Sequence, residues 1–473
     1  MKMLLSTHWV DRDTVMEIRN PQDNTIIDTV PKASHRDVEI ALASAEAAKI
    51  IARKLPIHER IAILRKAADL VLERQQDFAR TIATEGVKTI REARKEVTRC
   101  VETLRLSAEE ARRLGGEVVP FDQQPGSESR IGYWVRDPIG MIVAITPFND
   151  PLNLVAHKVG PAIAAGNVVI LKPHKQTPLS ALKLAQVFQE AGLPPGILQV
   201  LTGDGSDIGP ALVSDPRVRM VSFTGGLKTG ETIARQAGLK KLAMELGSNC
   251  PTIVMDDADL DLALPSIVSG AFWAAGQNCL HVQRVLVQSR VYEDVKQQLI
   301  EQASGYHVGD KLNEDTDMGP LVDQANAVRV ERVVNEAIAS KAELLTGGIR
   351  TGSFYRPTLL EHVPVQTALY QEEIYGPVTI LEQFHSYEEA ITQANNVNYG
   401  LQAAIFTRDV NTALHAVSDL HYGGVMINDS TDYRIDAMPF GGIKGSGLGR
   451  EGVRFAAHEM TEIKLACIHL QTR

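Results

Sequence analysis

The sequence predicts an α/β protein with two domains, each built around a largely parallel sheet. From Tyr133 onward, short β-branched runs alternate with helical segments, as is typical of parallel strands joined by crossover helices. These runs are hydrophobic almost throughout, which indicates strands that are covered by helices on both faces. A chain of 473 residues is also too long for one simple core, so two or three domains are expected.

The elements follow one another in a regular order. Residues 57–114 repeat apolar positions at three- and four-residue spacing, which predicts helices. The predicted strands of the first unit are MIVAITP, NVVILKP, ILQVLTG, RMVSFTGG and KLAMEL, and SALKLAQVFQEAGL, DIGPALVSD and TGETIARQAG are predicted helices between them. Beyond Ser248 a second unit begins with the strand PTIVM, a helix up to Ala275, the strand RVLVQ and a helix from Tyr292.

Two further segments read as strands but belong to neither unit. Residues 129–140 alternate polar and apolar side chains, and residues 458–470 form a C-terminal run of the same kind. Strands outside both cores have exposed edges, and pairing with another subunit is one way to cover them. The alternative is that the two segments pair with each other within one chain.

Composition excludes several classes of protein. A net charge of −9 gives no basic footprint for nucleic acid, and no apolar stretch reaches the ~20 residues that a membrane helix needs. The N-terminus MKMLLSTHWVDRD lacks the apolar core of a signal peptide. The cysteines lie far apart without a CxxC pair, which favours a reducing compartment over a disulfide framework or a zinc site. We therefore expect a cytoplasmic enzyme without a metal, and with neither nucleic acid nor membrane as a partner.

Cys279 ends an apolar helical run at the point where Gly276, Gln277 and Asn278 interrupt it. The strand Val282–Val287 follows, so the cysteine lies at a turn between a helix and a strand. A thiol at such a turn is a candidate nucleophile, provided that a base and an oxyanion donor lie near it. Cys250, which precedes PTIVM, is interpreted as a buried structural thiol.

Two strand ends suggest a site for a nucleotide. In VSFTGGLKTG a strand is followed by Gly225 and Gly226 and then by a helix, whose N-terminus attracts a phosphate. In VVILKPHKQTP a strand ends at Lys172, and a loop with His174 and Lys175 follows. The carboxyl ends of parallel strands are where a nucleotide binds in such a sheet. Taken alone, the glycine turn is equally consistent with a purely structural role.

Two more strand ends carry candidate catalytic side chains. Asn149 precedes a predicted helix with Asp150 as N-cap and Pro151 at its first position, and its carboxamide could donate to an oxyanion. Glu245 ends the strand KLAMEL, where burial would raise the pKa of a carboxyl and suit it to general-base catalysis. Turn chemistry for Asn149 and a structural ion pair for Glu245 are the alternatives.

Seven motifs together resemble the aldehyde dehydrogenase superfamily, and the resemblance covers nearly the whole chain. In chain order the motifs are TPFNDP, LKPHKQTP, FTGGLKTG, ELGSNCP, GQNC, EEIYGPV and MPFGGIKGSGLGREG. Their order and spacing match those of the family, which would rarely happen by chance. The chain is most similar to the branch that contains lactaldehyde, non-phosphorylating glyceraldehyde-3-phosphate and phosphonoacetaldehyde dehydrogenases.

The resemblance implies a fold and a set of domains. It implies a Rossmann-type cofactor-binding domain (1–122 and 144–248), an α/β catalytic domain (249–440) and a small β oligomerisation arm (123–143 and 455–473). A homodimer or homotetramer is the corresponding expectation.

The resemblance also assigns roles to residues. Cys279 is implied as the nucleophile, Glu245 as the general base and Asn149 as the oxyanion-hole side chain. The residues implied for cofactor binding are Thr146, Pro147, Lys172, His174, Lys175, Gly205, Phe223, Thr224, Gly225, Gly226, Leu246, Glu373 and Tyr375. Lys172 would bind the adenine-side ribose and Glu373 the nicotinamide ribose. The implied reaction forms a thioester on Cys279, and Glu245 activates the water that hydrolyses it to a carboxylic acid.

The motif around Lys172 bears on the choice of cofactor. The family usually has Lys-Pro-Ser-Glu, whose glutamate takes the ribose hydroxyls of NAD, whereas this chain has Lys172-Pro173-His174-Lys175. A lysine removes repulsion against a 2′-phosphate and supplies a cation to meet it. We therefore predict NADP as the preferred cofactor over NAD. In the alternative, Lys175 is solvated and the enzyme uses both.

The substrate is less clearly indicated. Arg105 lies at the edge of its helix's apolar stripe, His157 lies on the helix after Asn149, and Asn278 and Arg434 flank the expected tunnel. These four are the candidate substrate-binding residues, with a surface arginine and a core histidine as the alternative for the first two. An aromatic content of 5% argues against a wide aromatic tunnel. We favour a lactaldehyde-type substrate; phosphorylated, phosphonate and sulfonate aldehydes remain alternatives.

Two other kinds of function stay open at this point. One is a CoA-acylating dehydrogenase, although such family members typically lack a carboxylate at the position of Glu245. The other is a non-catalytic structural relative, which the presence of Cys279, Glu245 and Asn149 disfavours.

Overall fold

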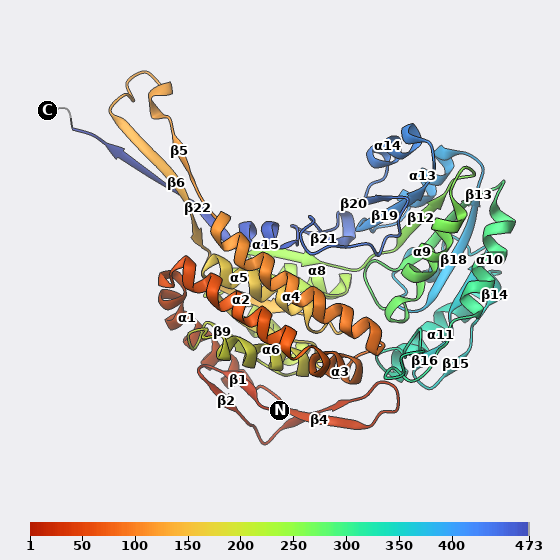
Figure 1. Cartoon of the computed structure of the whole chain (residues 1–473), viewed down its shortest axis with the longest axis horizontal. Helices are drawn as coiled ribbons and strands as arrows, with labels where there is room; N and C mark the ends of the chain where they lie inside the picture. Colours follow the sequence, from red (N-terminus) through yellow and green to blue (C-terminus); the bar gives the residue numbers. More distant parts are fainter. Residues whose placement is uncertain (472–473) are drawn as a thin grey trace.

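The computed structural model describes residues 1–471, in which two α/β units lie side by side and a three-stranded arm projects from the first (Figure 1). Each unit contains one large sheet whose central strands are parallel. The predicted α/β class with two sheet domains and a small β arm is therefore confirmed.

The sheet of the first unit has eight strands in the order β2-β1-β9-β8-β7-β10-β11-β21. Its parallel core consists of β9 (Leu198–Val200), β8 (Val168–Lys172), β7 (Met141–Ile145), β10 (Met220–Thr224) and β11 (Lys241–Glu245). Antiparallel strands close both edges: β1 (Met3–Leu5) and β2 (His8–Val10) at one, β21 (Gly447–Leu448) at the other. The strand order reverses between β7 and β10, and such a reversal opens a crevice at the carboxyl ends of the strands.

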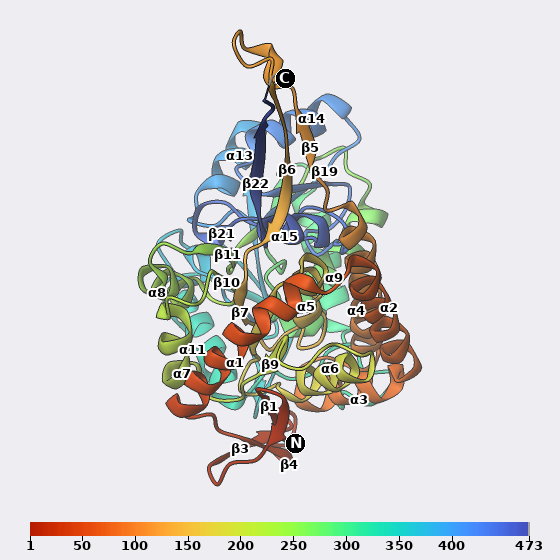
Figure 2. The ribbon, with the colours of Figure 1, turned by 90° about the vertical axis from the view of Figure 1, so that its left-hand side faces the viewer.

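Helices cover both faces of this sheet (Figure 2). The helices of this unit are α1 (His35–Lys54), α2 (Ile57–Glu73), α3 (Gln75–Glu85), α4 (Ile90–Arg113), α5 (Asn153–Ala165), α6 (Leu179–Glu190), α7 (Gly205–Ser214) and α8 (Leu227–Ala237). Of these, α2, α3 and α4 pack mainly against α5 and α6 and form an outer layer. The helical prediction for residues 57–114 thus corresponds to three helices. Helices α4 and α5 pack closely because Gly160 has no side chain: a Cβ there would lie 2.5 Å from Ser107 Oγ.

The sheet of the second unit has seven strands in the order β14-β17-β18-β13-β12-β19-β20. Their bounds are β12 (Cys250–Val254), β13 (Val282–Gln288), β14 (Glu343–Thr346), β17 (Thr358–Glu361), β18 (Val378–Phe384), β19 (Gln402–Phe406) and β20 (Gly424–Ile427). Its helices are α9 (Leu260–Phe272), α10 (Tyr292–Ser304), α11 (Gln324–Ala339), α12 (Ala368–Gln371), α13 (Tyr387–Asn395) and α14 (Val410–Asp419). A short hairpin, β15 (Arg350–Thr351) with β16 (Phe354–Tyr355), lies beside α11.

The arm consists of β5 (Glu117–Val119), β6 (Arg130–Pro138) and β22 (Thr461–His469), with β6 in the middle. The two outlying segments therefore pair with each other within one chain. The predicted arm limits need correction, because Met141 already begins β7 of the main sheet and α15 (Val453–Glu459) packs on α4 and α5. The end of the predicted arm, residues 472–473, lies outside the described residues.

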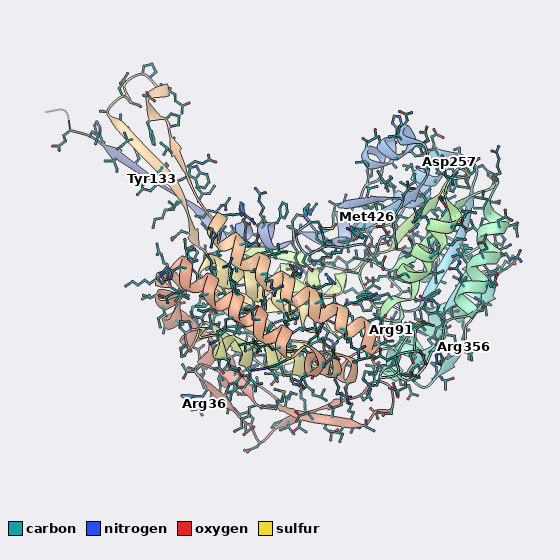
Figure 3. The ribbon with its side chains drawn as sticks, in the orientation of Figure 1. Arg36, Arg91, Tyr133, Asp257, Arg356 and Met426 are labelled. Atoms are coloured by element: carbon teal, nitrogen blue, oxygen red, sulfur yellow. The ribbon has the colours of Figure 1, made fainter. Side chains whose placement is uncertain are left out.

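The two units contact each other at several points away from the arm. The N-terminal hairpin of β3 (Val15–Arg19) and β4 (Ile26–Pro31) reaches the second unit, where Ser353 Oγ donates to the carbonyl of Pro21 at 2.6 Å. Arg91, which lies where α4 meets the second unit (Figure 3), donates to the carbonyl of Thr316 at 2.8 Å. Within residues 1–471, no helix has both the length and the apolar character required to cross a membrane.

Candidate active site

A cavity of about 1450 Å³ lies between the two units, at the carboxyl ends of β7 and β10. Its walls include Cys279, Glu245 and Asn149, the three residues predicted to be catalytic. They also include every residue predicted to bind the cofactor, together with Asn278 and Arg434. The strand reversal explains this convergence, since segments that follow β7 and β10 must turn away from each other and leave space between them.

Cys279 lies on a loop of unusual backbone conformation. Helix α9 ends at Phe272, earlier than predicted, and Ala274, Ala275 and Gly276 follow with φ angles of 50°, 55° and 66°. Only glycine fits the last position, because a Cβ there would lie 2.2 Å from the carbonyl oxygen of Gly376.

The thiol itself is partly exposed to the cavity. Asn278 braces the loop beside it: its Oδ1 accepts from the N–H of Leu280 at 3.0 Å, and its Nδ2 donates to the carbonyl of Trp273 at 3.3 Å. Burial raises the pKa of the Cys279 thiol, and the positive charge of Arg434 acts in the opposite direction. Arg434 is thus the main cation that favours the thiolate.

Glu245 ends β11 with its carboxyl group buried against the cavity. It is 3% exposed, and neither carboxyl oxygen has a hydrogen-bond partner among the described residues. Burial, followed by the negative charge of Glu451, raises the pKa of Glu245 well above its ordinary value. Glu451 behaves differently: it is buried too, but Lys158 at 2.9 Å and Arg434 at 3.3 Å lower its pKa to about 2.

The segment around Asn149 corrects one detail of the prediction. Helix α5 begins at Asn153, and Asp150 is not its N-cap, because the Asp150 carboxylate is engaged by Lys88 and Arg99. The carboxylate of Glu96 on α4 takes the capping role, accepting from the N–H groups of Leu152 at 2.8 Å and Asn153 at 3.0 Å. Asn149 is 5% exposed, and its Oδ1 has no partner among the described residues.

The part of the cavity predicted to bind the cofactor is lined by ionisable side chains. Burial lowers the pKa of Lys172 to about 8 and that of His174 to about 3. Lys175 is half-exposed and forms an ion pair with Asp204 at 3.0 Å. The carboxylate of Glu373 accepts from the N–H of Ser248 at 2.9 Å, and burial raises its pKa to about 7.

The glycine turn after β10 leaves room for a ligand. Gly226 is the N-cap of α8, and a Cβ there would meet nothing within 4 Å. Thr146 and Thr224 each have a buried hydroxyl without a partner among residues 1–471. An open helix N-terminus, a nearby lysine and a carboxylate for ribose hydroxyls are the groups that a nicotinamide dinucleotide needs, so these residues fit such a cofactor.

Two predicted substrate residues do not line the cavity. Arg105 is 42% exposed and pairs with Glu102 at 3.2 Å and Asp69 at 3.6 Å on the surface. The cavity-facing side of α4 is marked by Glu96 and Arg99, and Arg105 lies six residues beyond Arg99, which places it on a different face. The assignment of Arg105 to the substrate is therefore wrong.

His157 is fully buried behind the cavity wall. Its Nε2 lies 2.8 Å from Oδ1 of Asp436, and Nδ1 has no partner among the described residues. Burial lowers the pKa of His157, and Asn153 also donates to Asp436 at 3.2 Å. His157 therefore holds the segment that carries Arg434, instead of contacting substrate.

Sequence reasoning missed Arg99, Lys158 and Glu451. Arg99 lines the cavity, donates to Asp436 at 2.8 Å and to Asp150 at 3.4 Å, and has a buried Nε without a partner in the described chain. The available signal for Arg99 was its spacing of three residues from Glu96, which places both on one helical face. No local signal marks Lys158 or Glu451, since their pairing joins residues 293 positions apart.

Comparisons with known proteins identify the family. Residues 9–466 match the model of the aldehyde dehydrogenase family. Aspartate-semialdehyde dehydrogenase 1 of Pseudomonas canavaninivorans is 51% identical, over 96% of this chain and 97% of that protein. The 3-sulfolactaldehyde dehydrogenase of Priestia megaterium is 44% identical (99% and 98%), and the lactaldehyde dehydrogenase of Methanocaldococcus jannaschii is 40% identical (98% and 100%).

Comparison with solved structures also indicates the aldehyde dehydrogenase family. Aldehyde dehydrogenase 21 of Physcomitrella patens, in complex with its reaction product succinate, has a TM-score of 0.96 and 38% identity over 99% of this chain and 98% of that one. The glyceraldehyde-3-phosphate dehydrogenase GapN of Methanocaldococcus jannaschii, complexed with NADP, has a TM-score of 0.93 and 40% identity over 98% and 100%. The family model and these relatives show that the chain belongs to the aldehyde dehydrogenase family and is an NAD(P)-dependent enzyme that oxidises aldehydes.

Proposed function

We propose that the enzyme oxidises a short aldehyde with an anionic group at its far end, and that it prefers NADP. The observation that carries the proposal is the pair Arg99 and Arg434, which line the same cavity as Cys279 and each keep a buried Nε without a protein partner among residues 1–471. A guanidinium with free donors recognises carboxylate, sulfonate or phosphate. Relatives named for aspartate semialdehyde and sulfolactaldehyde, and a structure containing succinate, support this class.

The chemistry begins at Cys279. Its thiolate attacks the aldehyde carbon to form a C–S bond, and the side-chain amide of Asn149 donates a hydrogen bond to the oxyanion that develops. A nicotinamide cofactor held by residues such as Lys172 and Glu373 would supply the acceptor for the hydride of this carbon. The positive charge of Arg434 favours the Cys279 thiolate. The same side chain therefore both activates the nucleophile and binds the anionic group of the substrate.

Glu245 completes the reaction. As a carboxylate it removes a proton from the water that attacks the Cys279 thioester, the C–S bond breaks, and the carboxylic acid and the thiolate separate. Its free oxygens in a buried setting support this role. Hydrolysis also distinguishes the proposal from a CoA-acylating dehydrogenase, because free acid would then form without CoA.

The substrate assignment predicts an effect of Arg434→Gln. We expect the KM for succinate semialdehyde to rise at least about tenfold, the cost of one charge-assisted contact, while the KM for butyraldehyde changes less than threefold. Steady-state kinetics with saturating cofactor measures both. Arg105→Gln is the matched control and should leave both values unchanged, since Arg105 lies on the surface. Equal changes for the two aldehydes would contradict the anionic class and favour a neutral lactaldehyde-type substrate.

The preference for NADP rests on Lys175. It lines the cavity beside Lys172 and neutralises Asp204, which would otherwise repel a 2′-phosphate. Lys175→Glu removes one charge-assisted contact to the 2′-phosphate, so the KM for NADP is expected to rise about tenfold or more. The KM for NAD should fall, because the new carboxylate can accept from the ribose hydroxyls. Lys183→Glu, a reversal on α6 outside the cavity, is the control. An unchanged ratio of the two KM values would show that Lys175 is merely solvated.

We also propose that the enzyme is a homo-oligomer. The arm exposes large apolar side chains on both faces of its three strands: Val118, Ile131, Tyr133, Val135, Ile463, Leu465 and Ile468. An apolar stripe on α14 (Val410, Leu414 and Val417) is exposed as well, together with Ile427 at the end of the edge strand β20. A second copy would cover such surfaces. Sedimentation equilibrium of the full chain tests this, and a mass of about one chain at micromolar concentration would contradict it.

A further inference from the structure

Helix α4 carries a row of buried polar side chains that the reaction described above does not use. Glu92 and Glu96 lie one turn apart on its first half, and Lys88 lies just before the helix; none of the three is more than 7% exposed. Burying three charged groups is costly unless each is paired, so each is expected to have a specific partner. Apart from Thr89, the N-cap of α4, whose N–H donates to Glu92, the partners belong to the two segments that carry Cys279 and Asn149.

Glu92 contacts the nucleophile loop. Its Oε1 accepts from the N–H of Ala274 at 2.9 Å, and its Oε2 accepts from the N–H of Thr89 at 2.8 Å. Ala274 and Ala275 have positive φ angles, a conformation that residues with a Cβ keep only where their surroundings enforce it. Glu92 comes from the first unit and Ala274 from the second, so this bond fixes the strained loop across the boundary between the units.

Glu96 contacts the segment that carries Asn149. Its Oε1 accepts from Leu152 and Asn153, three and four residues beyond Asn149. Lys88 joins Glu96 to this segment: its Nζ donates to Glu96 Oε2 at 2.7 Å, bonds Asp150, and lies 4.6 Å from the ring centre of Trp273 on the nucleophile loop. One rigid helix therefore holds both segments.

We propose that Glu92 and Glu96 are positioning residues, which hold Cys279 and Asn149 at the separation that the oxyanion requires. The Cys279 thiolate must reach the carbonyl carbon while the Asn149 amide meets the oxygen bonded to it. The two residues come from different units, and no regular element contains both. Because Glu92 and Glu96 lie one turn apart on the same helix, α4 fixes the positions of the two segments relative to each other. Misplacement of a catalytic group by about 1 Å can cost on the order of 100-fold in rate, so this arrangement has a measurable effect.

The test uses Glu92→Gln and Glu96→Gln in the full-length enzyme. A carboxylate accepts two N–H groups at Glu92, whereas a glutamine has only one acceptor oxygen and turns an NH₂ group toward the other donor. We expect each variant to lower kcat by about 10- to 100-fold while the KM for aldehyde and for NADP changes less than threefold. Glu110→Gln is the matched control: it removes another buried carboxylate of α4, far from the cavity, and should keep wild-type kcat.

A second comparison separates positioning from a general loss of structure. In an Asn149→Ala background, Glu96→Gln should lower kcat less than twofold further, because the group that Glu96 positions is already gone. The same loss in both backgrounds would overturn the proposal, as would a kcat within twofold of wild type in both single variants. Thermal unfolding and NADP binding are measured for every variant; a kcat loss equal to the loss of folded or NADP-binding protein would also overturn it.

Discussion

Replacing Cys279 with alanine is expected to lower kcat for aldehyde oxidation by at least about 10⁴-fold, the scale seen when a covalent nucleophile is removed. The loss follows from the reaction chemistry, because no other described side chain of the cavity offers a thiol to the aldehyde carbon. Cofactor reduction followed at 340 nm measures it. Binding of NADP should persist, since the residues proposed to bind it lie on other segments.

Cys467→Ala is the matched control for this experiment. Cys467 lies on the arm, outside the cavity, and its replacement should leave aldehyde oxidation unchanged. In the wild type, alkylation of Cys279 should abolish oxidation in step with the modification. Oxidation by Cys279→Ala at more than about one per cent of the wild-type rate would contradict the assignment of the nucleophile.

Glu245→Gln is expected to separate the two halves of the reaction. The variant should reduce about one equivalent of NADP per active site in a rapid burst, and turnover should then slow by about 10²- to 10³-fold, because the Cys279 thioester lacks its base. Stopped-flow absorbance measures the burst. Absence of the burst would mean that the variant has lost hydride transfer. Glu245 would then act before hydride transfer instead of in hydrolysis.

The pH dependence of kcat follows from the same residue. Burial and Glu451 raise the pKa of Glu245, so the neutral acid persists above the ordinary range and the base form appears only as pH rises through the raised pKa. In the wild type kcat should therefore increase with pH on its acid limb, and Glu245→Gln should remove that limb. Glu382→Gln is the control, because burial also raises the pKa of Glu382 to about 7, but it lies outside the cavity.

The sequence predicted those parts of the site that depend on short segments. A strand end followed by a glycine turn or a polar residue recurs at Lys172, Gly226 and Glu245, and parallel strands bring such ends to one edge of a sheet. The order of the motifs along the chain added Glu373 and Tyr375, which local pattern alone does not single out. All five lie in the cavity.

The features that the sequence did not predict correctly share one physical cause: they depend on contacts between segments that are distant in the chain. Asp150 has the composition of an N-cap, but Lys88 and Arg99 take its carboxylate and Glu96 caps the helix from 56 residues away. Arg105 and Arg99 lie on one helix, and only the partners of α4 decide which of them faces the cavity. The strained run at Ala274 and Ala275 is likewise stabilised by neighbours that no local pattern reveals.

The substrate class is tested most directly by kcat/KM values for pairs of aldehydes of equal length, one anionic and one neutral. Succinate semialdehyde and butyraldehyde form one such pair, each measured with saturating NADP at the same ionic strength. With Arg99 and Arg434 in the cavity wall, we predict a value at least about tenfold higher for the anionic aldehyde, the scale of one charge-assisted contact. Equal values, or a higher value for the neutral aldehyde, would contradict recognition of an anionic substrate by this cavity.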